Sequence, residues 1–175
     1  MTEGIFTLIG VVLGAFIAWW IAHWGKRKQQ RAVAWAMAIE IAGFYRLYQK
    51  HIRTHLDGVD VLDASPPTFS GPVPRSFSVY EMNAQTFGDF SRATAESVVG
   101  FHALAGWFLS TVEDYQSSLA QELTLQKVVA RDSSPRRLLA QLQSMMSKLD
   151  TMALDACRQL SKEASKDFNT LPLTG

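Results

Sequence analysis

The sequence predicts an all-α protein: one N-terminal transmembrane helix that continues into a cytoplasmic antiparallel bundle of about three long helices plus one short helix. Apolar residues recur at helical steps of three and four in residues 33–52, 98–119 and 138–156. Residues 4–24 carry no charged side chain, which indicates a membrane span. No stretch of strand length alternates apolar and polar residues. These observations favour helices throughout the chain.

The run from Gly4 to Trp24 is long enough to cross a bilayer. A helix rises about 1.5 Å per residue, so the run would cover roughly 30 Å, the thickness of the hydrocarbon core. Glu3 precedes the run and a basic cluster follows it, which by the positive-inside rule places the N-terminus outside and the rest of the chain in the cytoplasm. We therefore expect a single-pass protein of the inner (cytoplasmic) membrane, with residues 1–31 as the anchor and its basic juxtamembrane segment.

Two sets of residues in this segment are candidate contact sites. Tryptophan rings and basic side chains favour the lipid headgroup layer, and the set expected at the membrane interface is Trp19, Trp20, Trp24, Lys26, Arg27, Lys28 and Arg31. Small residues at every fourth position allow a second helix to approach closely, and the expected helix-packing face is Gly10, Gly14, Ala18 and Ala22. This face would pair two copies of the chain or dock another membrane protein, with a plain anchor as the alternative.

Residues 32–170 are expected to form one cytoplasmic helical domain. Nothing breaks the helical pattern after the basic segment until Asp57-Gly58, so one long helix should leave the membrane and end near Leu56. Residues 57–77 hold four of the six prolines, which forbid a continuous helix and predict a long connection. Connections of this length are often functional, so this one is either a partner-binding or lid segment or a passive crossover.

Three further helices are predicted after the connection. A short one should begin at Ser78 and end near Phe90, because Ser78 and Glu81 fit the capping-box pattern. A long helix should follow over residues 93–131, and Ser134-Pro135 should begin the last one. The apolar seams of the two long helices favour an antiparallel hairpin, with the first long helix as its third wall.

Residues 98–112 are apolar on every side of their predicted helix, a pattern typical of deep burial or of membrane contact. The stretch is short for a span, and acidic residues bracket it. The bundle core is therefore its expected place, with membrane insertion as the alternative. Residues 171–175 follow the bundle as a tail.

The sequence offers one weak candidate for chemistry. His51 and His55 lie four residues apart on a predicted helix, a spacing that can place two imidazoles on one metal ion, with a polar helix end as the alternative. His102 lies within an apolar helix and is expected to be a hydrogen-bonded core residue, and Cys157 to be a buried or idle thiol. No phosphate-binding glycine loop, nucleophile elbow or zinc-protease motif occurs. We therefore expect no catalytic residue, no cofactor and no enzyme activity.

The distribution of charge argues against nucleic acid as a partner. The net charge is +1, and four of the 17 basic residues lie in residues 26–31. Residues 32–175 then carry 13 basic and 15 acidic residues, whereas nucleic-acid binding needs clustered positive charge. The single cysteine permits no internal disulfide and fits a reducing compartment.

The order of these parts resembles that of uncharacterised bacterial and phage single-span membrane proteins with a cytoplasmic helical domain. The resemblance is carried by the small-residue span, the basic segment, the Pro-rich connection, the helix start Tyr80-Glu81-Met82-Asn83 and the closing hairpin. It implies an architecture and no activity. The leading hypothesis is a membrane-anchored, non-enzymatic interaction or scaffold protein that self-associates through the span and the heptad helices. The alternatives are a membrane-perturbing effector of phage defence or lysis, and a metal-dependent enzyme using His51 and His55.

Overall fold

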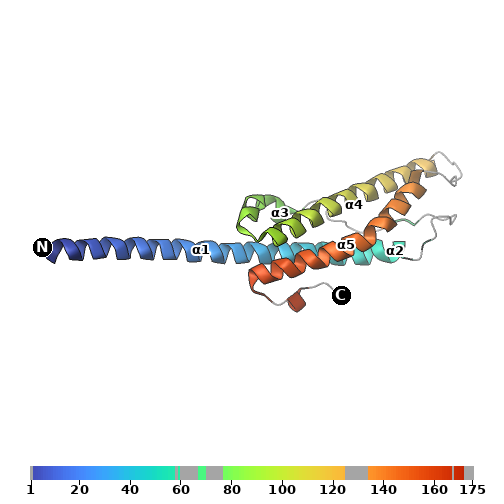
Figure 1. Cartoon of the computed structure of the whole chain (residues 1–175). Helices are drawn as coiled ribbons and strands as arrows, with labels where there is room; N and C mark the ends of the chain where they lie inside the picture. The colour runs from blue at the N-terminus through green and yellow to red at the C-terminus, as the bar shows by residue number, and fades with distance from the viewer. Residues whose placement is uncertain are drawn as a thin grey trace.

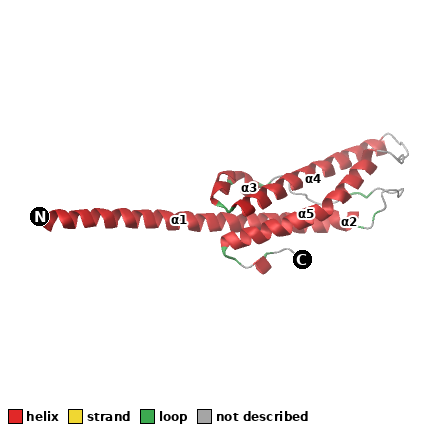
Figure 2. Ribbon diagram, in the orientation of Figure 1, coloured by secondary structure: helices red, strands yellow, loops and turns green. Residues whose placement is uncertain are grey.

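A computed structural model describes residues 2–57, 59, 67–69, 77–124, 134–166 and 168–171 of the chain. Every regular element in these ranges is a helix, and none is a strand (Figure 2). The predicted all-α class is therefore confirmed for the described chain. The fold consists of a bundle of three long helices, one of which projects far beyond the other two (Figure 1).

Helix α1 (Thr2–Tyr48) is the projecting helix. It continues through one π-helical turn, η1 (Gln49–Arg53), into a last turn, α2 (Thr54–Leu56). Its first half extends beyond every other helix, whereas its second half packs into the bundle (Figure 1). The backbone of Asp57 is extended, with φ −66° and ψ 121°, so the helix ends at Leu56 as predicted.

The projecting half of α1 contains the predicted membrane span. Over the part of the chain that the structure describes, no helix combines the length and the apolar character needed to cross a membrane. The described side chains of the predicted span are Phe16, Ala18, Trp19, Trp20 and Trp24, and its other side chains lie outside the described residues. A span needs about 20 consecutive apolar residues, and basic side chains follow these few directly. This finding overturns the predicted transmembrane anchor, its single-pass orientation and the location at the cytoplasmic membrane.

Helices α4 (Arg92–Thr124) and α5 (Ser134–Ala164) form the predicted antiparallel hairpin. Helix α5 packs against both α4 and the second half of α1, which is the predicted third wall (Figure 1). The predicted end of the long central helix at residue 131 lies outside the described residues. The hairpin therefore agrees with the heptad pattern that predicted it.

Short helices close the end of the bundle from which α1 projects. Before α4, the chain forms α3 (Ser78–Met82) and the 3-10 helix η2 (Ala84–Asp89), where one short helix was expected. Asn83 joins the two and leaves the helical conformation, with φ −114° and ψ 16°. After α5, the chain forms η3 (Phe168–Thr170), and residues 172–175 of the predicted tail lie outside the described chain.

The apolar seam predicted for α4 forms the centre of the bundle. Its members are at most 5% exposed: Val98, Phe101, Ala105, Phe108, Val112, Tyr115 and Leu119. The Phe101 ring meets Phe44 of α1 edge to face, with centroids 5.7 Å apart. The Phe108 ring meets Tyr48 in the same way at 5.3 Å. The seam is therefore filled by helices of the same chain.

Residues 98–112 are buried on one side of α4 only. Val99 and Trp107 are 45% and 56% exposed on its outer side, whereas Phe101 and Phe108 are fully buried on its inner side. The bundle core is therefore the place of this stretch, as expected. None of the described helices is long and apolar enough to cross a membrane, and insertion of this shorter stretch stays a prediction.

Carboxylates from distant helices fix the starts of α3 and α4. The predicted capping box is wrong, because Ser78 makes no capping bond. Instead, the Glu40 carboxylate of α1 accepts hydrogen bonds from the backbone N–H groups of Val79 at 2.8 Å and Tyr80 at 3.1 Å. Two of the free N–H groups at the start of α3 are thereby satisfied from another helix.

The start of α4 is held in a similar way. The Ser91 hydroxyl accepts a bond from the Thr94 N–H at 3.3 Å, as an N-cap residue does. The Ser91 N–H in turn donates to Glu163 of α5 at 2.9 Å, and the Thr94 hydroxyl donates to the same carboxylate at 3.1 Å. These bonds lower the pKa of Glu163, although burial acts in the opposite direction. Glu163 therefore ties the end of α5 to the start of α4.

The connection from residue 57 to residue 77 is described at Val59 and at Pro67–Phe69. The Tyr115 hydroxyl of α4 donates to the Pro67 carbonyl at 2.7 Å, and its ring lies 5.3 Å from that of Phe69. Burial raises the pKa of Tyr115 to about 12. The predicted partner-binding or lid segment otherwise lies outside the described residues.

Candidate interaction surface

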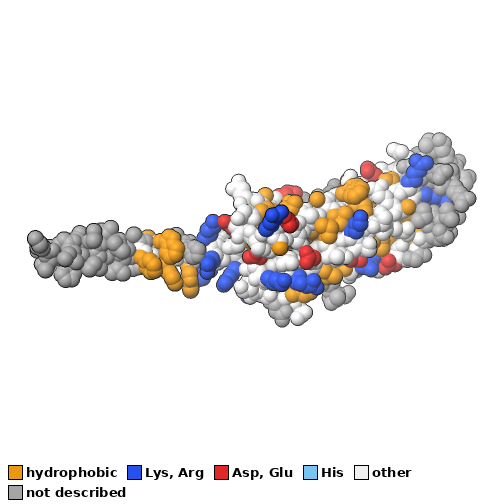
Figure 3. Space-filling view, viewed as in Figure 1, with side chains coloured by type: hydrophobic (Ala, Val, Ile, Leu, Met, Phe, Trp, Pro, Cys, Tyr) orange, Lys and Arg blue, Asp and Glu red, His pale blue; other side chains and the backbone are white. Residues whose placement is uncertain are grey.

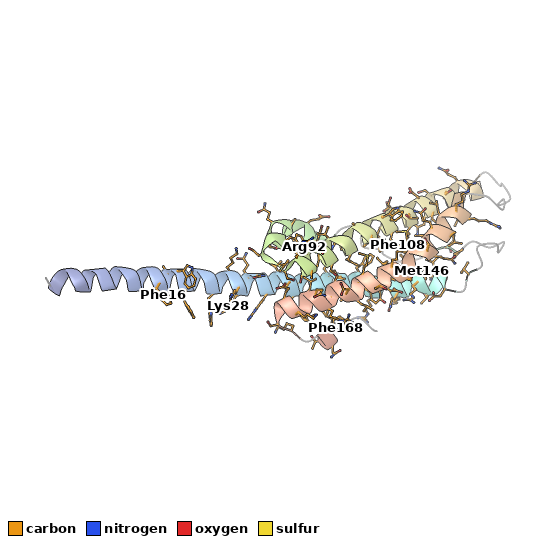
Figure 4. The ribbon with its side chains drawn as sticks, viewed as in Figure 1. Phe16, Lys28, Arg92, Phe108, Met146 and Phe168 are labelled. Atoms are coloured by element: carbon orange, nitrogen blue, oxygen red, sulfur yellow. The ribbon has the colours of Figure 1, made fainter. Side chains whose placement is uncertain are left out.

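Four aromatic side chains stand on the projecting half of α1. Phe16, Trp19, Trp20 and Trp24 are each 52–59% exposed. At about 3.6 residues per turn, positions 16, 20 and 24 follow one another along one face, and position 19 lies beside them. The Phe16 ring lies 5.9 Å from Trp19 and 6.2 Å from Trp20. We name these four residues the aromatic face, which is the orange group on the projecting helix in Figure 3 and carries Phe16 in Figure 4.

The aromatic face ends at the basic segment. Lys28 Nζ lies 5.2 Å from the centre of the Trp24 ring, a cation–π contact. Arg27 and Arg31 are exposed. A clustered apolar patch with a charged rim is typical of a surface that binds another molecule. Of the residues predicted for a membrane interface, the three tryptophans thus belong to the aromatic face and Lys28 borders it, while no described helix is long and apolar enough to cross a membrane.

One basic residue of the segment has a structural role. The Lys26 ammonium lies 2.7 Å from the Asp89 carboxylate at the end of η2. Gln30 Nε2 donates to the backbone carbonyl of the same residue. These contacts fix η2 to α1 at the point where α1 leaves the bundle. No local pattern connects residues so far apart in the sequence, so the prediction missed this pair.

The predicted helix-packing face is described at one position. Ala18 is exposed and lies two residues from both Phe16 and Trp20, about 200° around the helix, so it is opposite the aromatic face. The side chains of Gly10, Gly14 and Ala22 lie outside the described residues. Pairing through the small residues therefore stays a prediction.

The structure places the two histidines proposed as metal ligands at the end of the first long helix. His51 is half-buried in η1 and His55 is exposed in α2. Within the described ranges, no three His, Cys, Asp or Glu side chains come together in a group that could hold a metal ion. The described residues therefore supply no third ligand, and a metal site at His51 and His55 stays a prediction.

A partly buried ion pair joins the π-helical turn to α5. Arg53 Nη1 donates to Asp150 Oδ2 at 2.5 Å, and Arg53 Nε lies 3.4 Å from the Asp57 carboxylate. Burial raises the pKa of Asp150, although Arg53 acts in the opposite direction. Burial and the same carboxylate raise the pKa of Tyr45. The four-residue spacing of Arg53 and Asp57 is a local signal for their pair, but nothing local could indicate Asp150.

His102 is the buried core histidine that the sequence predicts. Its Nδ1 donates to the Val98 carbonyl at 2.8 Å, because a carbonyl oxygen can only accept. Its ring stacks on Tyr80, with centroids 3.8 Å apart, and meets Phe77 edge to face at 4.7 Å. Its Nε2 is buried and bonds to no described atom. Burial lowers the pKa of His102, so the imidazole is neutral at pH 7.

Cys157 is a core residue rather than a reactive thiol. Its side chain is fully buried in α5, with the sulfur 3.7 Å from the Ala38 carbonyl of α1. Burial raises the pKa of the thiol to about 12. The thiolate, which is the reactive form, is therefore not populated near neutral pH.

These features define a class: an all-α bundle whose first helix projects and carries an exposed aromatic face. No protein-family model matches the chain, and no significant match was found among curated proteins or solved structures. The resemblance to single-span bacterial and phage proteins therefore stays a prediction about architecture.

Proposed function

We propose that this protein is a non-enzymatic scaffold that associates with a second copy of itself through the aromatic face of α1. The observation that carries the proposal is the exposure of four aromatic side chains on a helix that has no neighbouring helix along its first half. Aromatic residues bury more apolar area than other side chains and dominate the energetics of protein interfaces.

The stability of the projecting helix supports the same proposal. In proteins, most of the stability of a helix comes from packing one of its faces against another element, rather than from intrinsic propensity. The second half of α1 obtains this packing from α5, with Ala34, Met37, Ala38 and Ile41 fully buried. Figure 1 shows no other described helix beside the first half, and a second copy would supply this packing.

The heptad seams are less suited to self-association. The α4 seam is buried inside the chain, and in α5 Leu142, Met145, Leu149 and Ala156 are buried as well. Pairing two copies through these seams would require opening the bundle. The aromatic face, in contrast, is available without any change in the fold.

The charge at the end of the aromatic face favours an antiparallel pair. Two parallel copies would bring Arg27, Lys28 and Arg31 of one chain beside the same residues of the other, and like charges repel. An antiparallel pair would place the basic segments and the two bundles at opposite ends. We therefore expect antiparallel pairing.

Sedimentation equilibrium of the full chain tests the proposal. Wild-type protein should form a dimer, and Trp20→Ala should raise the dissociation constant at least tenfold because a central aromatic anchor is lost. Trp107→Ala is the matched control, since Trp107 is 56% exposed on α4, away from the aromatic face. Ala18→Leu tests the opposite side of α1 and should leave the constant unchanged.

Two results would contradict the proposal. One is a wild-type chain that stays monomeric at all concentrations measured. The other is equal weakening by Trp20→Ala and Trp107→Ala, which would assign association to exposed tryptophan in general. A loss of dimer in Ala18→Leu alone would instead assign pairing to the predicted small-residue face.

A further inference from the structure

A groove of about 980 Å³ runs along α1, η1 and α2 on the surface of the bundle half of the molecule. Its lining begins at Ile39 and ends at Thr54, a length of about 22 Å at 1.5 Å per residue. Phe44 and Leu47 line its centre, and Phe77 lines it from the segment before α3. The volume lies within the range of sites that hold small molecules, about 300–1,000 Å³.

Gly43 contributes to the space of the groove. A glycine in the middle of a helix costs about 1 kcal/mol relative to alanine, and close packing against a neighbour is the usual structural reason for it. That reason is absent here, because no atom lies within 4 Å of the place where a Cβ would stand. The missing side chain therefore leaves open space above α1 rather than room for another element.

The two ends of the groove differ in charge. At one end, the Glu40 carboxylate is already bound by the backbone N–H groups of Val79 and Tyr80. Arg46 lines the middle of the groove beside Leu47, and Lys50 lines it one helical turn further towards the other end. Neither cation forms an ion pair with a carboxylate among the described residues. The groove thus combines apolar side chains in its middle with positive charge that extends from its middle towards one end and is paired by no described carboxylate.

We propose that this groove binds a small amphiphilic anion, with its apolar body over Phe44 and Leu47 and its acidic head between Arg46 and Lys50. The positive charges of Arg46 and Lys50 favour an anionic head group, and the apolar side chains in the middle of the groove favour an apolar body. Ten of the described residues line the groove, whereas a stable protein interface uses about 20–30 residues on each side. A small molecule is therefore a better fit than a protein partner. The proposal is independent of self-association through the aromatic face.

Isothermal titration with dodecanoate below its micelle concentration tests this site. Wild-type chain should bind about one dodecanoate, and dodecyltrimethylammonium, which has the same tail and the opposite charge, should bind at least tenfold more weakly. Gly43→Leu should weaken dodecanoate binding at least tenfold, because its side chain fills the groove. Gly106→Leu is the matched control, since its Cβ also has no atom within 4 Å and it is exposed on α4. Circular dichroism and thermal melting check that both variants fold.

A second pair of variants separates the charge from the apolar centre. Arg46→Gln together with Lys50→Gln should weaken dodecanoate at least tenfold and leave dodecanol binding unchanged. Trp20→Ala should leave dodecanoate binding unchanged, which excludes the aromatic face as the site. Equal binding of the anion and the cation, absence of binding to wild type, or full binding to Gly43→Leu would overturn the proposal. A Gly43→Leu chain that loses self-association instead would assign the groove to a second copy.

Discussion

Glu40 and Glu163 show how single carboxylates hold this fold together. Each accepts backbone N–H bonds at the start of a short or long helix that lies far away in the sequence. The end of α5 that carries Glu163 is itself fixed, because the N–H groups of Ser165 and Lys166 bond back to the carbonyls of Lys162 and Ser161. Ser165 takes φ 54° in this Schellman motif. The bundle is therefore stabilised by polar contacts at its ends as well as by its core.

His102 makes a residue-scale prediction about pH. Its pKa is lowered in the folded chain, chiefly by burial and against the pull of Glu40. A lowered pKa contributes stability that is present above the unfolded value, about 6.5, and is lost as the pH falls through the folded value. The free energy of unfolding should therefore decrease as the pH is lowered from 7 towards 5.

The variant His102→Phe isolates this effect, because it keeps an aromatic ring beside Tyr80 and removes the titratable nitrogens. Chemical denaturation at a series of pH values should give a shallower decrease for the variant than for wild type. The groups facing His102 are Tyr80, Phe77 and Phe101 by ring contact and Glu40 by charge, and all of them are shared by the two proteins. Identical pH profiles would show that His102 does not titrate in this range.

At the scale of elements, the heptad pattern predicts what packing later confirms. The seam positions of α4, the hairpin with α5 and the end of the first long helix at Leu56 all follow from local periodicity and from the Asp57-Gly58 stop signal. Periodicity identifies a buried face because one stripe of a helix must face the core. These features depend on residues close together in the sequence, and they are the part of the fold that could be predicted.

Two features that could not be predicted have a common physical cause, since each involves partners distant in the sequence. The start of α3 is capped by Glu40, which lies 38 residues before Ser78, and not by the capping box predicted at Ser78. The ion pair of Arg53 joins Asp150 across 97 residues, and no local pattern indicates it. Of the candidate site, the aromatic residues Trp19, Trp20 and Trp24 could be identified from the sequence. The membrane span predicted beside them is wrong, because no described helix is long and apolar enough to cross a membrane.

Two mid-helix glycines make a matched prediction at this scale. Gly43→Ala should raise the free energy of unfolding by about 0.5–1 kcal/mol, because alanine favours the helix and no atom lies within 4 Å of its Cβ. Gly100→Ala should gain less, since its Cβ would lie 2.8 Å from the Met152 methyl group, which must move. Denaturant unfolding of both variants measures the difference. Equal gains would show that the contact of α4 with α5 at Gly100 is loose.

At the scale of the whole molecule, the fold separates two tasks. The bundle buries its seams within one chain, while the first half of α1 extends beyond it and presents the aromatic face (Figures 1 and 3). Lys26 and Asp89 fix the direction in which α1 leaves the bundle. An aromatic face held away from the bundle in this way suits the pairing of two copies. Such pairing would hold the two bundles at defined positions relative to each other.

The most direct test of this account measures distances between two copies by double electron–electron resonance. A spin label on Gly25→Cys would report on α1, and one on Gly106→Cys on the bundle; both positions have open space around the Cβ. Cys157 is buried with a raised thiol pKa and should not be labelled. We predict a defined distance for the Gly25 pair that is much shorter than that for the Gly106 pair, and loss of both in Trp20→Ala. A shorter Gly106 distance, or no dipolar signal at position 25, would contradict self-association through the aromatic face.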